Sequence, residues 1–271
     1  MRRRWSCVCL FSVLCGFLLS VEYVNPYNDS ILLSELIMQL SGSRGSLVLG
    51  FSMHELLSLV LRMVPDFIIE MYLGILMYQH FCTASIYVFS RYPRRVRWYW
   101  GEVLSLGIQV MLYQLFLLLS VILISICRMD VQFDNIGLFL MVYHLVVKVM
   151  WIFCIALAIN LLAIFLGSDS AFLFIMSIQI LLITILGFAD DLTEEKRVCF
   201  LRYNPMARLV SGWQSGEFPN LKIKIISSIK GLEISDAILQ LMILCVIVVV
   251  IGAILIKQHD LLCSDAEEGD R

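Results

Sequence analysis

Charged side chains are scarce in this sequence. Only 15% of its 271 residues are Asp, Glu, Lys or Arg, whereas 60% are hydrophobic. A soluble domain of this length needs a charged surface, so the composition excludes that class of protein. The formal net charge of −2 also gives no reason to expect nucleic-acid binding, which depends on an excess of positive charge.

Patterns that bind metals or carry catalysis are also missing. Of the nine cysteines only Cys7 and Cys9 are closely spaced, and zinc sites and disulfide frameworks need clustered or paired cysteines. The motifs HExxH, GxSxG and GxxxxGK[ST] do not occur. In "TEEKR" (193–197), Arg197 comes too early for the intramembrane proteases with paired glutamates. We therefore expect no enzyme, no metal and no cofactor in this chain.

What the sequence does contain is long apolar runs, and it has a mean hydropathy of +0.88. A helix needs about 20 apolar residues to cross a hydrocarbon core of roughly 30 Å. We predict an all-α integral membrane protein with one domain over residues 1–271. The positively charged "MRRR" at the start precedes an uncleaved anchor rather than a signal peptide, because no small-residue cleavage site follows. The six predicted transmembrane helices cover residues 5–21, 67–89, 103–127, 138–166, 171–188 and 238–256.

The basic residues predict the orientation, because Lys and Arg beside membrane spans are retained in the cytoplasm. "MRRR" precedes the first span, and "SRYPRRVRW" (90–98) follows the second. Both termini and the loop around 90–98 are then cytoplasmic. Seven basic residues in the outer segment 189–235 count against this orientation, although the acidic residues there nearly match them.

Three short amphipathic helices are predicted on the outer surface. The first is in "SILLSELIMQL" (30–40), where apolar residues recur at helical spacing. The second begins with Ser52 and Glu55, which form a capping-box pattern, and Pro65 is expected to end it before the second span. The third is in "YNPMARLVSGW" (203–213), where Asn204 is a candidate N-cap and Pro205 suits the first helical position.

Polar residues inside the predicted spans are informative, because burying them in hydrocarbon is costly. Glu70 lies in the second span, and the fourth contains His144, Lys148 and Asn160. His144 and Lys148 are four residues apart and share one helix face. Two interpretations stay open. These side chains pair between helices, for instance Glu70 with Lys148, or they line a substrate path.

Two stretches, "FSRYPRRVRWYWGEVLSLG" (89–107) and "YNPMARLVSGW" (203–213), together with the six spans, resemble ABC-2-type transporter permeases. In that family the permease does no chemistry, and a separate cytoplasmic ATPase drives transport. The resemblance implies that "GSDS" (167–170) forms a second cytoplasmic turn. It also implies a coupling contact with the ATPase at Arg91, Tyr92, Pro93, Arg94, Arg95 and Arg97.

The resemblance further implies a complex of two permease subunits, identical or related, with two ATPase subunits that bind ATP and Mg. We expect this complex in a bacterial plasma membrane, where it exports a peptide, an antibiotic or a lipid, as in antibiotic resistance or bacteriocin immunity. The alternative is a non-transporting membrane sensor or assembly protein whose outer helices bind a ligand. Co-isolation with an ATPase distinguishes the two.

Overall fold

Six long helices make up most of the computed structural model, which describes residues 2–24, 30–41, 53–87, 95–214, 216–218, 223–225 and 232–258. Each predicted span falls on one of these helices, although residues 88 and 89 lie outside the described part. The helices are α1 (Arg2–Tyr23), α3 (Met53–Tyr87), α4 (Arg95–Arg128), α5 (Asn135–Leu166), α6 (Ser168–Leu186) and α9 (Ile234–Gln258).

Within the described residues, four helices are long and apolar enough to cross a membrane, namely α4, α5, α6 and α9. This is consistent with an all-α membrane protein. The apolar part of α1, Val8–Tyr23, is shorter. The 35 residues of α3 include Arg62, Asp66 and Glu70, which lower its hydropathy. Membrane crossing by α1 and α3 stays a prediction.

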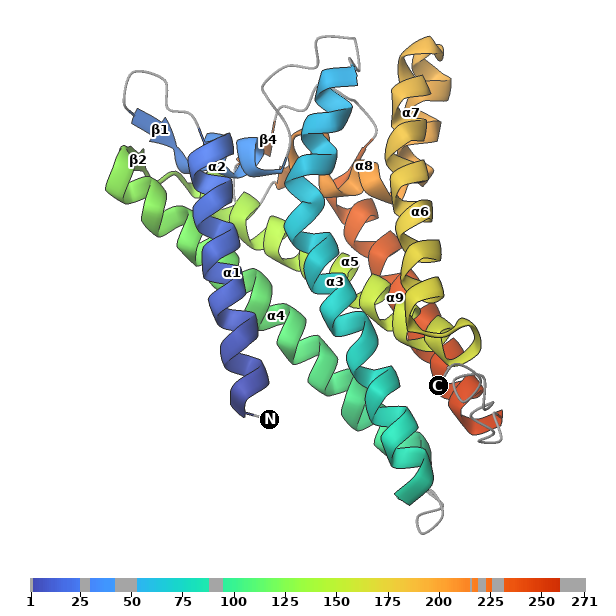
Figure 1. Cartoon of the computed structure of the whole chain (residues 1–271). Helices are drawn as coiled ribbons and strands as arrows, with labels where there is room; N and C mark the ends of the chain where they lie inside the picture. The colour runs from blue at the N-terminus through green and yellow to red at the C-terminus, as the bar shows by residue number, and fades with distance from the viewer. Residues whose placement is uncertain are drawn as a thin grey trace.

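Successive long helices run in opposite directions along the bundle (Figure 1). The start of α1, the end of α3, the start of α4, the connection between α5 and α6 and the end of α9 all lie at the lower end in this view. The upper end carries the shorter helices and the strands. The start of α1 and the end of α9 therefore lie at the same end of the bundle, while the side of the membrane that this end faces stays a prediction.

The helix α3 differs from the prediction because Pro65 does not end a helix. The segment expected as a separate amphipathic helix is instead the first part of α3, which continues through Pro65 to Tyr87. A proline within a helix leaves one backbone carbonyl without its usual donor. Such prolines are tolerated within membrane helices, where neighbouring groups can satisfy the freed carbonyl. The predicted N-cap Ser52 lies outside the described residues.

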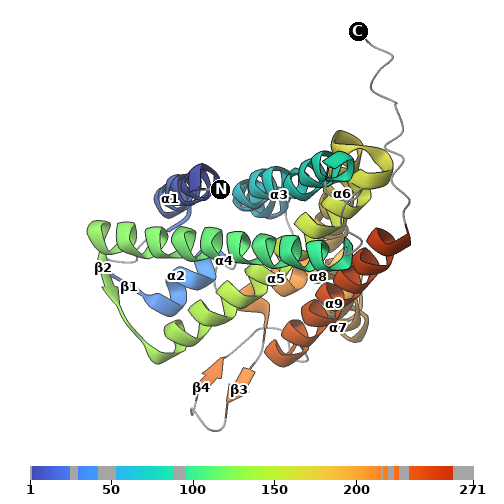
Figure 2. The same ribbon diagram turned by 90° about the horizontal axis from the view of Figure 1, so that it is seen from below.

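The closest helix packing is between α1 and α4, and it depends on small side chains. Ser12, Gly16 and Ser20 recur every four residues along α1, and both serines are fully buried. A Cβ atom added at Gly16 would lie 1.7 Å from Oγ of Ser120 and 2.7 Å from the carbonyl oxygen of Leu117. Such spacing of small residues lets helix backbones approach closely in membranes. Figure 2 shows α4 with α1 on one side and α5 on the other.

At the upper end, α2 (Leu33–Leu40) confirms the first predicted short helix, and its apolar stripe is buried. The strand β1 (Ser30–Leu32) precedes it and pairs in parallel with β2 (Asp130–Gln132), which follows α4. Asp134 connects the two regions, because its carboxylate accepts hydrogen bonds from the backbone N–H of Ser34 and of Gly137. One side chain thus satisfies donors at the starts of α2 and α5.

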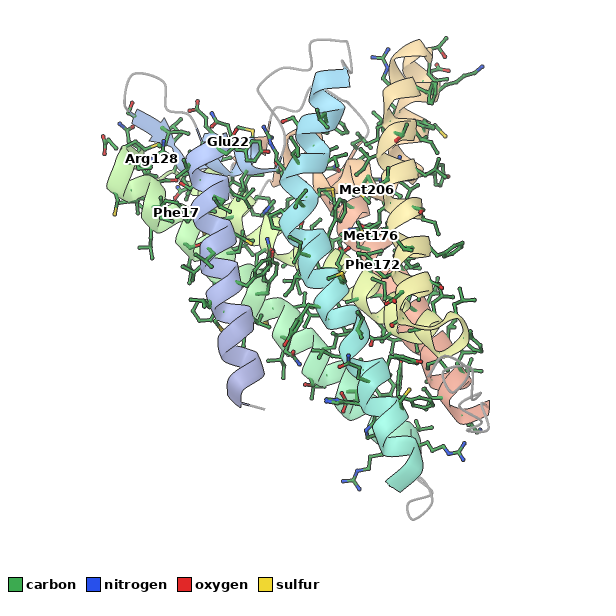
Figure 3. All side chains as sticks on the ribbon, viewed as in Figure 1. Phe17, Glu22, Arg128, Phe172, Met176 and Met206 are labelled. Atoms are coloured by element: carbon green, nitrogen blue, oxygen red, sulfur yellow. The ribbon has the colours of Figure 1, made fainter. Side chains whose placement is uncertain are left out.

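The segment between α6 and α9 is more ordered than a loop. It contains a 3-10 turn (Gly187–Asp191), α7 (Glu194–Tyr203), α8 (Pro205–Leu209), a second 3-10 turn (Ser211–Trp213) and the hairpin of β3 (Gly216–Phe218) with β4 (Ile223–Ile225). The predicted cap of α8 is confirmed, since the side chain of Asn204 accepts from the N–H of Met206. Figure 3 shows Met206, which belongs to α8, above Met176 of α6. Met206 is buried, and Met176 packs against the core.

The connection between α5 and α6 is tighter than expected. Only Gly167 separates the two helices, and residues 168–170 of the predicted "GSDS" turn already belong to α6. Gly167 has φ of +80°, a backbone conformation that side chains with a Cβ atom rarely adopt. A glycine there allows the chain to reverse within one residue.

Candidate functional site

A group of polar side chains from five helices meets in the interior of the bundle. We call this group the polar cluster, and it consists of Cys15 of α1, Asp66 and Glu70 of α3, Tyr113 of α4, Lys148 of α5 and Gln179 of α6. Apart from Lys148, which is slightly more exposed, every member is in the most buried class of residues. Buried polar groups in an apolar bundle need partners, so their contacts indicate what the cluster does.

The strongest interaction in the polar cluster is an ion pair. The Nζ atom of Lys148 lies 2.6 Å from Oδ2 of Asp66, and the two side chains are 12% and 6% exposed. The expected partner of Lys148 was Glu70, but the observed partner is Asp66, one helical turn earlier on α3. The prediction missed Asp66 because it started the second span at residue 67, after Pro65. Its position four residues before Glu70, on the same helix face, is the signal that identifies it.

Glu70 is fully buried and pairs with an amide instead of a cation. Its Oε2 accepts a hydrogen bond of 2.8 Å from Nε2 of Gln179. Within the described part of the chain, Oε1 of Glu70 and Oε1 of Gln179 have no hydrogen-bond partner. Gln179 was also missed, although a lone amide in the apolar run 171–188 is a readable signal.

Two further helices contribute to the polar cluster through weaker interactions. Tyr113 lies close enough to Asp66, Glu70 and Cys15 to interact with them electrostatically, and Cys15 interacts in the same way with Asp66. The Tyr113 hydroxyl has no hydrogen-bond partner in the described residues, and its ring stacks on Phe11 with centroids 6.2 Å apart. The polar cluster therefore extends from α6 across α3 and α5 to α1 and α4.

His144 and Asn160 lie on the same helix as Lys148 but have different surroundings. His144 is 2% exposed, and its Nδ1 has no partner in the part of the chain that the structure describes. Asn160 connects α5 to α3: its Oδ1 accepts from the Tyr78 N–H at 3.0 Å, and its Nδ2 donates to the Leu73 carbonyl at 2.9 Å. Asn160 and Lys148, both on α5, thus each bond to a group on α3, which is the pairing between helices that the first interpretation expects. A substrate path stays a prediction.

A second buried cation lies at the upper end, and its role was not predicted from the sequence. Arg208 of α8 is 1% exposed and donates to Oε1 of Gln240 at 3.1 Å and to Oε1 of Gln214 at 3.2 Å. It also donates to the carbonyl oxygen of Arg202 at 3.0 Å. Burial lowers the pKa of the Arg208 guanidinium from its ordinary value. These contacts attach α7 and α8 to α9, which is a structural task.

The residues of the expected coupling contact are only partly described. Arg91, Tyr92, Pro93 and Arg94 lie outside the described residues. Arg95 and Arg97 form the first turn of α4, at the lower end of the bundle (Figure 1), where Arg97 is exposed. The helix α4 begins at Arg95, within the basic stretch 90–98 and eight residues before the predicted span.

Comparison with known proteins assigns no function to this site. The sequence matches no family model, and comparisons with curated proteins and with solved structures find no significant match.

Proposed function

We propose that this chain is the permease subunit of an ABC-2-type exporter, which a separate cytoplasmic ATPase drives. The observation that carries the proposal is the position of Arg95 and Arg97. They begin α4 at the same end of the bundle as the Gly167 turn between α5 and α6. These are the two turns that the resemblance assigns to the cytoplasmic side, and an ATPase that docks there contacts four of the long helices.

The polar cluster fits this proposal, because a transporter needs interactions that hold its helices in one arrangement and release them in another. An ion pair in an apolar interior has a large desolvation penalty, so its free energy changes strongly when water enters. In this proposal, opening of the bundle toward substrate hydrates Asp66 and Lys148. The substrate is a peptide, an antibiotic or a lipid, and the complex contains two permease subunits in a bacterial plasma membrane with both termini in the cytoplasm.

The alternative function, a sensor or assembly protein, is favoured by one observation at the other end. An open surface depression of about 470 Å³ lies between α6 and α7, with Lys196 as its charged residue and Leu182, Phe200 and Tyr203 along its lining. A small ligand that docks there would be held mainly against apolar and aromatic side chains. In the alternative, ligand binding at this end is the function, and no ATPase is required.

Purification of the tagged chain from its native membrane tests the proposal. We expect an ABC ATPase to co-purify and to hydrolyse ATP. The double substitution Arg94→Glu and Arg95→Glu should abolish this association, because like charges across a docked interface cost several kcal/mol. Replacing both arginines with Lys preserves the charge and should weaken coupling without preventing membrane insertion. Isolation of the chain without any ATPase, at normal expression, would favour the alternative.

A further inference from the structure

A cavity lies between α3 and α4 near the lower end of the bundle, and it has a volume of about 330 Å³. Volumes of this size lie at the lower limit of typical ligand pockets. In the described residues α3 packs mainly on α5 and α6, whereas α4 packs mainly on α1, α5 and α9. The two helices therefore leave a space between them, although they are neighbours in the sequence.

The charged residues of this cavity lie at one end of it. His80 of α3 and Arg97 and Glu102 of α4 lie nearer the ends of the two helices where residues 88–94 connect them. Leu76, Met77 and Leu106 line the deeper part, together with the uncharged polar residues Ser105 and Gln109. Trp98 also lines the cavity and packs on Phe81, with ring centroids 6.0 Å apart. Tryptophan and arginine beside an apolar wall are typical of the level of lipid headgroups.

The charges at the mouth are of both signs. Arg97 is exposed and has no hydrogen-bond or ion-pair partner in the part of the chain that the structure describes. Glu102 is five residues further along α4 and also lines the cavity, and its Oε2 is 3.2 Å from Nδ1 of His80. The other carboxylate oxygen of Glu102 is not engaged by this contact. A ligand that matches the mouth carries an anionic group for Arg97 and a cationic group for Glu102.

We propose that this cavity binds phosphatidylethanolamine, a phospholipid with a primary amine in its headgroup. The phosphate pairs with the Arg97 guanidinium, and the ammonium donates to the Glu102 carboxylate. An acyl chain follows Leu76, Met77 and Leu106 into the apolar part of the bundle. Charge complementarity favours this lipid over phosphatidylglycerol, which has no amine for Glu102. The proposal does not depend on an ATPase, so it stands or fails separately from the exporter function.

Lipid retention by the purified full-length chain tests this site. The protein in mild detergent is incubated with phosphatidylethanolamine, phosphatidylglycerol or phosphatidylcholine, and bound lipid is measured by native mass spectrometry. Phosphatidylcholine has the same charges, but its methylated amine donates no N–H hydrogen bond. We expect about tenfold tighter retention of phosphatidylethanolamine than of the other two, which corresponds to about 1.4 kcal/mol. Equal retention of all three lipids would overturn the proposal, and so would a preference for phosphatidylglycerol.

Substitutions then assign the preference to the cavity. Glu102→Gln should remove the preference for phosphatidylethanolamine over phosphatidylglycerol, whereas Arg97→Gln should weaken retention of both. Arg202→Gln, an exposed arginine at the opposite end, is the matched control and should change neither. Thermal unfolding of each variant verifies that it is folded. A folded Glu102→Gln variant with an unchanged lipid preference would contradict the assignment.

Discussion

Lys148 and Asp66 form an ion pair between α5 and α3, and their charged atoms are 2.6 Å apart in an apolar interior. The two residues are 82 positions apart in the sequence, so only the tertiary fold brings them together. Because both charges are largely removed from water, each depends on the other. Removing one partner should therefore cost more stability than removing both.

The first prediction follows from this dependence. Lys148→Met should destabilise the protein by about 3 to 5 kcal/mol, because it leaves the Asp66 carboxylate buried without a cation. Replacing both residues, with Asp66→Leu and Lys148→Met, should restore most of the lost stability. Unfolding by detergent titration measures both variants. If the double variant folds but does not transport, the ion pair acts in function as well as in packing. If it is no more stable than Lys148→Met alone, the pairing is refuted.

The second prediction concerns Asn160, which bonds to two backbone groups of α3. Asn160→Leu should cost about 1 to 3 kcal/mol, because it leaves the Leu73 carbonyl and the Tyr78 N–H with fewer partners. Asn160→Asp keeps the acceptor for Tyr78 but loses the donor to Leu73. Thermal unfolding in detergent compares the three proteins. The neighbouring Phe165→Leu is a control, since Phe165 is exposed. Equal stability of Asn160→Leu and the parent would exclude this structural role.

The third prediction concerns the close contact of α1 with α4. Gly16→Val should separate the two helices, because even a Cβ atom at this position would overlap Oγ of Ser120. We expect a loss of about 1 to 3 kcal/mol, the usual range for overpacking. Leu18→Val, on the exposed side of α1, is the matched control. A variant pair of cysteines across the α1–α4 contact reports the separation by its cross-linking yield. A yield unaffected by Gly16→Val would argue against this packing.

The fourth prediction is the orientation of the bundle. In a variant without native cysteines, a cysteine at Gly216 should react with a membrane-impermeant maleimide in intact cells. A cysteine at Arg95 should react only after the cells are opened. Gly216 begins β3, which pairs with β4 at the upper end of the bundle, whereas Arg95 begins α4 at the lower end (Figure 1). Labelling of the Arg95 position from outside would reverse the topology and remove the basis for ATPase docking there.

Much of the fold follows from local sequence. The apolar runs locate the six long helices. In hydrocarbon, a single run of this length satisfies its backbone N–H and C=O groups only by forming a helix. The caps follow in the same way, because Asn204 and Pro205 supply an acceptor and a fixed φ within two residues. The buried stripe of α2 is also local, as helical spacing places its apolar residues on one face.

The failures concern interactions between distant parts of the chain. Pro65 was expected to end a helix on local grounds, yet α3 continues through it. The strands β1 and β2 were not expected, because nothing in three residues near position 30 indicates a partner near position 130. The tight approach at Gly16 was missed as well, since a glycine among serines indicates close packing but not the helix that packs there.

The sequence by itself therefore determined the all-α class and the approximate positions of the six long helices, and it identified some of the polar residues in apolar surroundings, among them Glu70, Lys148 and Asn160. Only the tertiary structure decided how those residues are paired. Asp66 and Glu70 lie on one face of α3, and a sequence cannot show which of them contacts Lys148 and which contacts Gln179. That choice depends on the rotation and depth of α5 and α6 against α3, and packing across the whole bundle sets these quantities.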